Sequence, residues 1–230
     1  MIFDKQIVKA RFISRPNRFQ AYVNIDDVQL MIHVPNTGRC REILIPGVTV
    51  ILREENNPNR KTKYDLIAVY KGTRLINIDS QIPNKIVDEA LKMSKISYFR
   101  NCKNIEREKT FGNSRFDFKL LDKDNKEYYL EVKGVTFEED GVARFPDAPT
   151  ERGRKHLLEL VQVKKSNMGA AVLFLIQMEG IKCFKPYDEI DKKFGDYLRY
   201  ADKEGVKILA YDCFVGENFI TLKDEIKVCL

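Results

Sequence analysis

The sequence predicts a mixed α/β chain of two domains, an OB-like β-barrel followed by a domain with the element order αβββαβ. Residues 1–80 read as short strands separated by turns and show little helical periodicity. Residues 82–176 read as helix, three strands, helix and strand. The pattern changes near Ser80–Pro83, so we expect domains at residues 1–81 and 82–230.

Five or six short strands make up the predicted barrel. The candidates are Gln6–Ile13, the segment around Phe19–Ile25, Val28–Val34, Val48–Arg53, Tyr64–Tyr70 and Arg74–Ile78. Barrels of this type often bind single-stranded nucleic acid through a basic groove and stacking aromatic rings. Phe12, Phe19 and Tyr22 alternate with arginines, but we expect at least two of these rings to lie in the core.

Positive charge is concentrated in the first domain. Residues 1–80 hold 13 Lys and Arg against 8 Asp and Glu, and the other 150 residues hold 27 against 26, which together give the net charge of +6. This excess suits a polyanion, and nucleic acid is the first candidate, although many proteins with such a charge bind nothing acidic. The candidate DNA contacts are Arg15, Arg18, Arg39, Arg60, Lys61 and Lys63.

Two loops of the first domain have compositions that suit phosphate. In His33–Arg39, Pro35 ends a strand, and Asn36 and Gly38 permit positive φ, so exposed amides could hold an anion. The segment Asn59–Tyr64 carries three cations beside an aromatic ring. A structural turn and a solvated hairpin tip are the alternatives for these two loops.

The second domain is predicted to open with a helix at Ile82, on which Glu89 lies at the border of the apolar face and could look into a cleft. Thr150 is expected to cap the second helix, and the apolar run Ala170–Ile176 reads as a buried strand. The remaining elements are strands at about Lys103–Phe111, Arg115–Leu121 and Tyr128–Thr136, helices over Glu151–Lys165 and Asp191–Lys203, and added strands at Val206–Phe214 and Asn218–Leu222.

The cysteines and the apolar runs favour a cytoplasmic protein that has no membrane partner. Five cysteines are scattered without a CxxC pair, which argues against a disulfide framework, a disulfide-linked partner and a zinc site, and fits a reducing compartment. The longest apolar run is too short to span a bilayer, and the start MIFDKQIVKARF lacks the features of a signal peptide.

Two neighbouring strands carry charged residues that suit metal chemistry. Asp117 lies between two phenylalanines and points away from them, while Glu131 and Lys133 share one face of the next strand. If Asp117 lies on that face, two carboxylates and one ammonium meet, as a Mg²⁺- or Mn²⁺-dependent phosphodiester hydrolysis site requires. The alternative is a solvated edge strand on which charged residues alternate.

The spacing of these residues, Asp117 followed by Glu131-x-Lys133, matches the PD-(D/E)xK nuclease pattern, and the αβββαβ order is the core of those nucleases. We therefore expect Asp117 and Glu131 to bind metal, with the Val132 carbonyl as a third ligand. Lys133 would position or activate water, and Glu89 would support the metal directly or through water.

The helix after the motif offers further charges. Arg152 and Lys155 lie early on it, where a cation could contact the scissile phosphate. His156 is expected to be a surface or packing histidine, because a lone histidine more often has a structural role.

Short motifs spread along the chain are typical of one protein family. They are Arg15–Phe19, His33–Arg39, Arg60–Thr62, Asn84 with Glu89–Leu91, Gly112–Phe118, Glu131–Lys133, Phe145–Ala148 and Thr150–Leu157. By these motifs the chain closely resembles, nearly from end to end, the sugar fermentation stimulation protein A (SfsA) family. The resemblance implies an N-terminal OB-like barrel, a PD-(D/E)xK-like domain, non-specific DNA binding and a regulatory role in maltose metabolism. Gly134 departs from the family, which usually carries Ser after the E-V-K.

Three functions follow as hypotheses. The first is a DNA-binding protein with a Mg²⁺-dependent nuclease site, acting as an endonuclease or an exonuclease. The second is a non-catalytic DNA-binding regulator that kept the fold, since fold does not settle activity. The third is a binder of an anionic metabolite at Pro35–Arg39. Whether DNA is cut stays open at this point, as does a homodimer, an arrangement common among enzymes that cut both strands.

Overall fold

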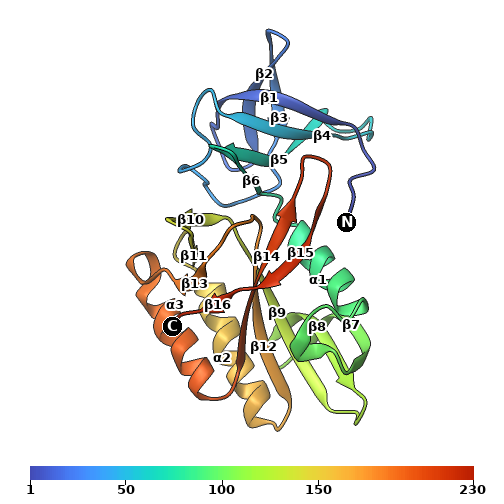
Figure 1. Ribbon diagram of the computed structural model, residues 1–230, viewed down its shortest axis with the longest axis vertical. Helices are drawn as coiled ribbons and strands as arrows, with labels where there is room; N and C mark the ends of the chain where they lie inside the picture. The colour runs from blue at the N-terminus through green and yellow to red at the C-terminus, as the bar shows by residue number, and fades with distance from the viewer. The chain divides into compact units, whose positions relative to one another are not determined.

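The computed structural model describes residues 1–230, which divide into two compact units (Figure 1). The first unit contains Met1–Ile82, Gln177–Glu179 and Cys213–Thr221. The second contains Pro83–Ile176, Gly180–Asp212 and Leu222–Leu230. A single boundary after residue 81 was predicted, whereas two short later segments pack with the first unit. Hydrogen bonds hold them there, including one from Tyr70 Oη to Glu217 at 2.5 Å.

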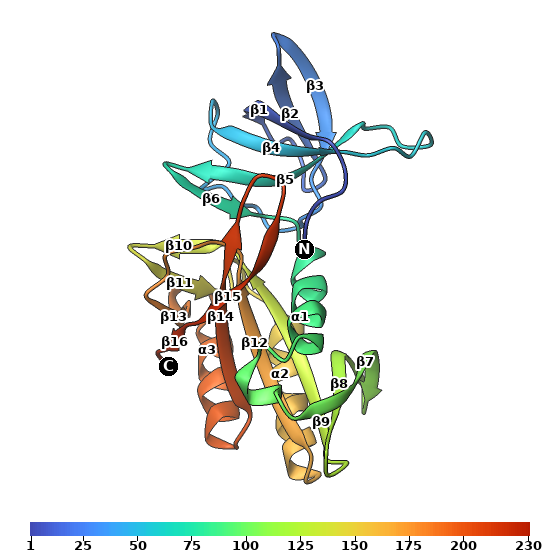
Figure 2. The same cartoon turned by 45° about the vertical axis from the view of Figure 1, so that its right-hand side comes forward.

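The first unit is the predicted OB-like barrel, whose strands are visible in Figure 2. The strand order is β3-β2-β1-β4-β5-β6, and a parallel bridge between His33 and Asp65 joins β3 to β5 and closes the barrel. Its strands are β1 (Ile7–Ser14), β2 (Gln20–Ile25), β3 (Val28–His33), β4 (Thr49–Glu54), β5 (Tyr64–Lys71) and β6 (Arg74–Asn77).

The aromatic residues of the barrel are less buried than expected. Phe12 is 3% exposed, but Tyr22 is only half-buried and Phe19 is 55% exposed. Phe19 lies in the turn before β2. The expectation that at least two of the three rings lie in the core was therefore wrong.

A buried ionic network closes one side of the barrel around Asp65, which is 4% exposed. His33 Nδ1 lies 2.8 Å from Asp65 Oδ1, Arg53 donates to Oδ2 at 3.2 Å, and Arg60 also donates to this carboxylate. Burial acts to raise the pKa of Asp65, but the hydrogen bonds from Arg60 and His33 outweigh it and hold the pKa below its ordinary value. The network therefore depends on a charged Asp65.

Asp65→Asn is expected to lower the free energy of unfolding by about 2 kcal/mol at neutral pH, since hydrogen bonds to a charged group are lost. Because the folded-state pKa is lowered, this contribution is complete above the unfolded value of about 3.9 and is lost as the pH falls through the folded value. Urea unfolding of both proteins at neutral and acid pH measures this effect. The difference between their free energies of unfolding should become smaller at acid pH. A gap independent of pH would contradict a charge-dependent network.

The second unit contains a six-stranded sheet, a small four-stranded sheet and three α-helices. The main sheet has the order β15-β14-β12-β9-β8-β7, and the small one β10-β11-β13-β16. The elements are α1 (Ile82–Lys92), a 3₁₀ turn (Ser97–Phe99), β7 (Cys102–Phe111), β8 (Ser114–Asp122), β9 (Glu127–Val135), β10 (Phe137–Glu139), β11 (Val142–Phe145), α2 (Glu151–Lys165), β12 (Gly169–Ile176), β13 (Cys183–Pro186), α3 (Asp188–Lys203), β14 (Lys207–Val215), β15 (Ile220–Glu225) and β16 (Lys227–Val228).

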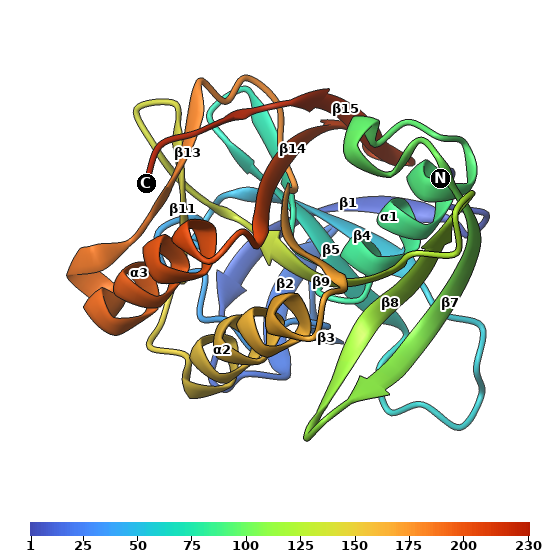
Figure 3. The same cartoon turned by 90° about the horizontal axis from the view of Figure 1, so that it is seen from below.

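The predicted αβββαβ order is confirmed in α1, β7, β8, β9, α2 and β12. The β10–β11 hairpin between β9 and α2 is an addition that the sequence did not predict. All eight residues of β12 are buried, and parallel neighbours β9 and β14 flank it on both edges. Figure 3 shows α2 and α3 side by side in the second unit.

Candidate active site

The strands β8 and β9 separate at the predicted motif. Their antiparallel pairing ends at Phe118 with Leu130, although both strands continue beyond these residues. Asp117 and Glu131 come next along the two strands, so they are neighbours where the backbone ladder stops. The Asp117 carboxylate takes the place of a backbone acceptor, because its Oδ2 accepts the Val132 amide at 2.7 Å.

Asp117 is held from a second side by the first helix. Asn84 on α1 donates from Nδ2 to Asp117 Oδ1 at 2.7 Å, so each carboxylate oxygen has one donor. Burial and the nearby charge of Glu131 nevertheless raise the pKa of Asp117 above its ordinary value. The charged form of Asp117 is therefore less stable in the folded protein than in water, even though it accepts two hydrogen bonds.

Glu131 is also buried, at 4% exposed, but unlike Asp117 it contacts side chains that favour its charged form. Its Oε1 accepts from Lys133 Nζ and contacts His156 Nδ1, each at 2.5 Å. Burial acts to raise the pKa of Glu131, but His156 and Lys133 outweigh it, and the pKa is lowered. The other oxygen, Oε2, is buried and has no hydrogen-bond partner.

The buried Oε2 of Glu131, which has no hydrogen-bond partner, bears on whether this cluster suits a divalent cation. A buried oxygen without a partner carries a desolvation cost, and two neighbouring carboxylates repel each other; a divalent cation would relieve both. No group of three or more His, Cys, Asp or Glu side chains is placed to hold a metal. The residues present fit an ion such as Mg²⁺, which is commonly bound through one or two carboxylates and several waters.

His156 contacts the cluster, although it was predicted to be only a surface or packing histidine. It is 4% exposed, contacts Glu131, and its Nε2 lies 3.4 Å from Arg152 Nε. Because Arg152 can only donate, Nε2 is the acceptor, which assigns the proton of a neutral ring to Nδ1, facing Glu131. Asn84 was also missed as a site residue, since only its position at a helix start and in a family motif stood out.

The other predicted residues of this unit lie at different distances from the cluster. Arg152 is exposed and joins it through His156. Lys155 is exposed and instead donates to the backbone oxygen of Asn113 at 3.1 Å. Glu89 lies five residues after Asn84, which turns it about 140° around α1 from the residue that contacts Asp117. Its role at the metal stays a prediction.

The six cations predicted to bind DNA in the barrel differ in how their charge is used. Arg60 lies in the Asp65 network, and Lys63 pairs with Glu54 at 3.1 Å. Arg15 donates to the backbone oxygens of Arg18, Asn36, Gly38 and Arg39 at 2.6–2.8 Å. Arg60 and Arg15 therefore hold the barrel together, whereas Lys63 forms an ion pair at the surface. The side chains of Arg18, Arg39 and Lys61 are exposed and form no ion pair.

The predicted anion loop His33–Arg39 is organised differently from the expectation. The Gly38 amide donates to Asn36 Oδ1 at 2.6 Å, and Asn36 Nδ2 donates to the Ile78 oxygen at 2.7 Å. With the Gly38 amide used internally and the carbonyls turned to Arg15, the loop conforms to the structural-turn alternative.

Comparisons with known proteins identify the same family in both units of the chain. Two family models match, the SfsA N-terminal OB domain at residues 13–78 and the sugar fermentation stimulation protein RE domain at residues 81–219. Sugar fermentation stimulation protein homologs from Clostridium kluyveri and Clostridium tetani are 70% and 63% identical over 230 residues, with full coverage of both chains.

A solved structure supports the same assignment. Pyrococcus furiosus SfsA, determined in complex with Ca²⁺, matches with a TM-score of 0.90 and 26% identity over 100% of both chains. No helix of the present protein is long and apolar enough to cross a membrane. The two matched domains and the full-length relatives show that this chain belongs to the sugar fermentation stimulation protein family.

Proposed function

We propose that this protein binds DNA through its OB barrel and hydrolyses phosphodiester bonds at the cluster of Asp117, Glu131 and Lys133 with Mg²⁺ or Mn²⁺ bound. The observation that carries the proposal is the buried Oε2 of Glu131, which lacks a partner beside a second carboxylate whose pKa is raised. A divalent cation bound at the cluster would offset this cost, and buried carboxylates with perturbed pKa values cluster at functional sites.

The family relationship is consistent with a bound divalent cation. The Pyrococcus furiosus relative was determined in complex with Ca²⁺ and shares the fold over its full length. Ca²⁺ and Mg²⁺ both take oxygen ligands, which is the kind of ligand that Asp117 and Glu131 offer.

Each residue of the cluster would have a separate role. Asp117 and Glu131 would hold the metal together with the Val132 carbonyl, and Glu89 would support it. A divalent ion at such a site supplies charge stabilisation at the phosphate and acidifies a bound water. Lys133 would position or activate that water, and Asn84 and His156 would orient the two carboxylates. Arg152 and Lys155 would contact the substrate phosphate, and both are exposed.

Cleavage of labelled single-stranded, duplex and branched DNA tests this function directly. We expect one of these substrates to be cut with Mg²⁺ or Mn²⁺ and none to be cut with EDTA. DNA binding without cleavage of any substrate would instead favour a regulator that kept a nuclease-like fold.

DNA affinity is expected to fall with salt, in proportion to the cations that contact phosphate. If Arg18, Arg39 and Lys61 each neutralise one phosphate, they contribute about −2.7 to the slope of log K against log salt on duplex DNA. Each alanine substitution among them should reduce the slope by about 0.9. Fluorescence anisotropy over a salt series measures this. Salt-independent binding would exclude a backbone-contacting barrel.

A further inference from the structure

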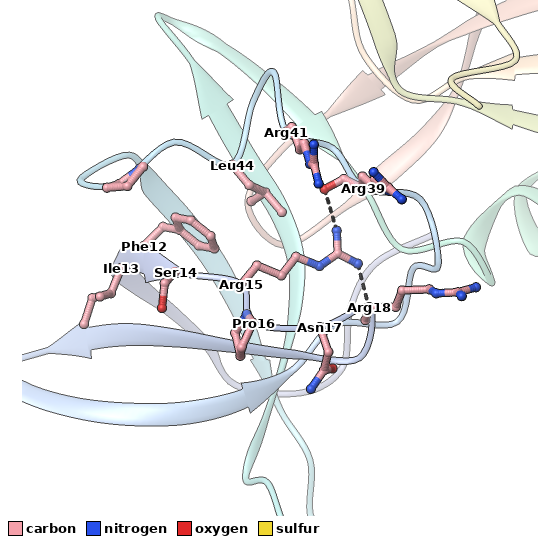
Figure 4. Close-up of a pocket in the computed structure, with 11 residues that line it drawn as sticks. Phe12, Ile13, Ser14, Arg15, Pro16, Asn17, Arg18, Arg39, Arg41 and Leu44 are labelled. Carbon is pink, nitrogen blue, oxygen red and sulfur yellow. Dashed lines mark hydrogen bonds between the residues drawn. The ribbon is translucent and has the colours of Figure 1, made fainter. Parts of the chain in front are cut away.

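The first unit contains a pocket of about 490 Å³ between the β1–β2 turn and the segment that joins β3 to β4 (Figure 4). Its volume lies within the range of small-molecule sites, roughly 300–1,000 Å³. Four of its eleven lining residues are arginines and none is acidic. The residues that matter below are Arg15, Arg18, Arg39, Arg41, Phe12 and Leu44.

Arg15 builds the pocket wall and does not serve as a free cation. Figure 4 shows its guanidinium between the backbone oxygens of Arg18 and Arg39, to which it donates at 2.7 and 2.8 Å. It thereby ties the β1–β2 turn to the β3–β4 segment and fixes where the neighbouring arginines project. Burial lowers the pKa of Arg15, and no acidic side chain contacts it.

The remaining arginines carry charge that the protein does not neutralise. Arg18, Arg39 and Arg41 are exposed and form no ion pair. By contrast, Arg53 and Arg60 of the same barrel are matched by Asp65 and neighbouring acids. Three exposed arginines without an ion pair thus gather at the pocket, whereas the two arginines of the Asp65 network are compensated by acids. This distribution indicates that a ligand supplies the counter-charge.

We propose that this pocket binds the 5′-phosphate of a nucleotide, either at the end of a DNA strand or free. Arg18, Arg39 and Arg41 would bind the phosphate, with the nucleoside against the apolar wall that includes Phe12 and Leu44. A terminal phosphate monoester carries about −1.5 to −2 charges at neutral pH, against one for an internal diester, so an acid-free group of arginines favours the terminus. Planar guanidinium groups also bind phosphate oxygens in a bidentate manner. The strand-end case rests on the DNA binding proposed above.

Fluorescence anisotropy with short single-stranded DNA, labelled at its 3′ end and carrying a 5′-phosphate or a 5′-hydroxyl, tests the proposal. EDTA in the buffer prevents cleavage. We expect the phosphorylated strand to bind about tenfold more tightly, which corresponds to about 1.4 kcal/mol. Arg39→Ala and Arg41→Ala should abolish this preference. Lys61→Ala is the matched control, since it removes one exposed cation of the same barrel outside the pocket. It should weaken the binding of both strands equally and so keep the preference for the 5′-phosphate.

Competition separates the two sources of the phosphate. If free deoxyadenosine monophosphate displaces the phosphorylated strand only at concentrations far above that of an unlabelled 5′-phosphorylated strand, the pocket serves strand ends. If it competes equally well, and Arg41→Ala weakens both, the pocket serves free nucleotides.

The failures of the two proposals can be told apart. Equal binding of both strands by the native protein would overturn the pocket proposal and leave DNA binding intact. If no strand binds, the DNA function fails, and calorimetric titration of deoxyadenosine monophosphate into native protein and Arg41→Ala decides the pocket. Saturable binding that the variant loses would uphold the pocket, and its absence would overturn it. Arg41 is exposed, so its substitution should leave the melting temperature unchanged.

Discussion

DNA cleavage by the Lys133→Ala variant is expected to fall by about 10²–10⁴-fold, the range typical of losing a group that takes part in proton transfer. Lys133 Nζ lies 2.5 Å from Glu131 Oε1, and its side chain is 15% exposed. No other lysine or arginine contacts Glu131, so no second ammonium or guanidinium group is placed to take over. The rate should be measured at saturating enzyme, on whichever DNA the native protein cuts best.

The control is Lys123→Ala, which removes an exposed lysine of the β8–β9 turn. Lys123 lies just beyond the end of β8, away from the cluster, so the cleavage rate of this variant should match that of the native protein. Lys133→Ala leaves Glu131 with one partner in place of two, so its melting temperature must be recorded alongside. A folded Lys133→Ala variant that cuts within about twofold of the native rate would remove Lys133 from the chemistry. DNA affinity should be equal in all three proteins.

The motif residues could be predicted because their relation is local. Strand alternation puts Glu131 and Lys133 on one face, and a short polar connection makes β8 and β9 antiparallel neighbours. The partners of the motif could not be found in this way. Asn84 lies 33 residues from Asp117, and His156 lies 25 residues from Glu131. Both contacts depend on how two helices pack, which periodicity does not determine.

The cations of the barrel show a second limit of reasoning from sequence. Composition reveals where positive charges occur but not whether each is already paired. Arg60 looked like a phosphate contact, yet its partner Asp65 follows five residues later across a turn. Arg15 uses its donors on carbonyls up to 24 residues away. Arg41, which lines the basic pocket without an acidic partner, was absent from the predicted set although it lies two residues from Arg39.

Asp117→Asn is expected to abolish metal binding and to make the metal-free protein more stable. Asparagine keeps the size of the side chain but removes the charge that a divalent ion requires. Because burial and Glu131 raise the pKa of Asp117, the uncharged form suits the site better than the charged form even after two hydrogen bonds are counted. The same carboxylate therefore weakens the metal-free fold and enables the proposed function, as is common where activity and stability compete.

Thermal and urea unfolding with and without Mn²⁺ measure both effects. A ligand present at about 100 times its Kd raises the free energy of unfolding by about 2.7 kcal/mol. Mn²⁺ should raise the free energy of unfolding of the native protein by this amount and leave that of Asp117→Asn unchanged. Without metal, Asp117→Asn should have the higher melting temperature of the two. Asp124→Asn, an exposed residue in the β8–β9 turn, makes the same chemical change away from the cluster and should behave as native. If Asp117→Asn retained the Mn²⁺-dependent gain, the metal would bind elsewhere, and the cluster would lose the chemistry assigned to it even if the protein still cut DNA.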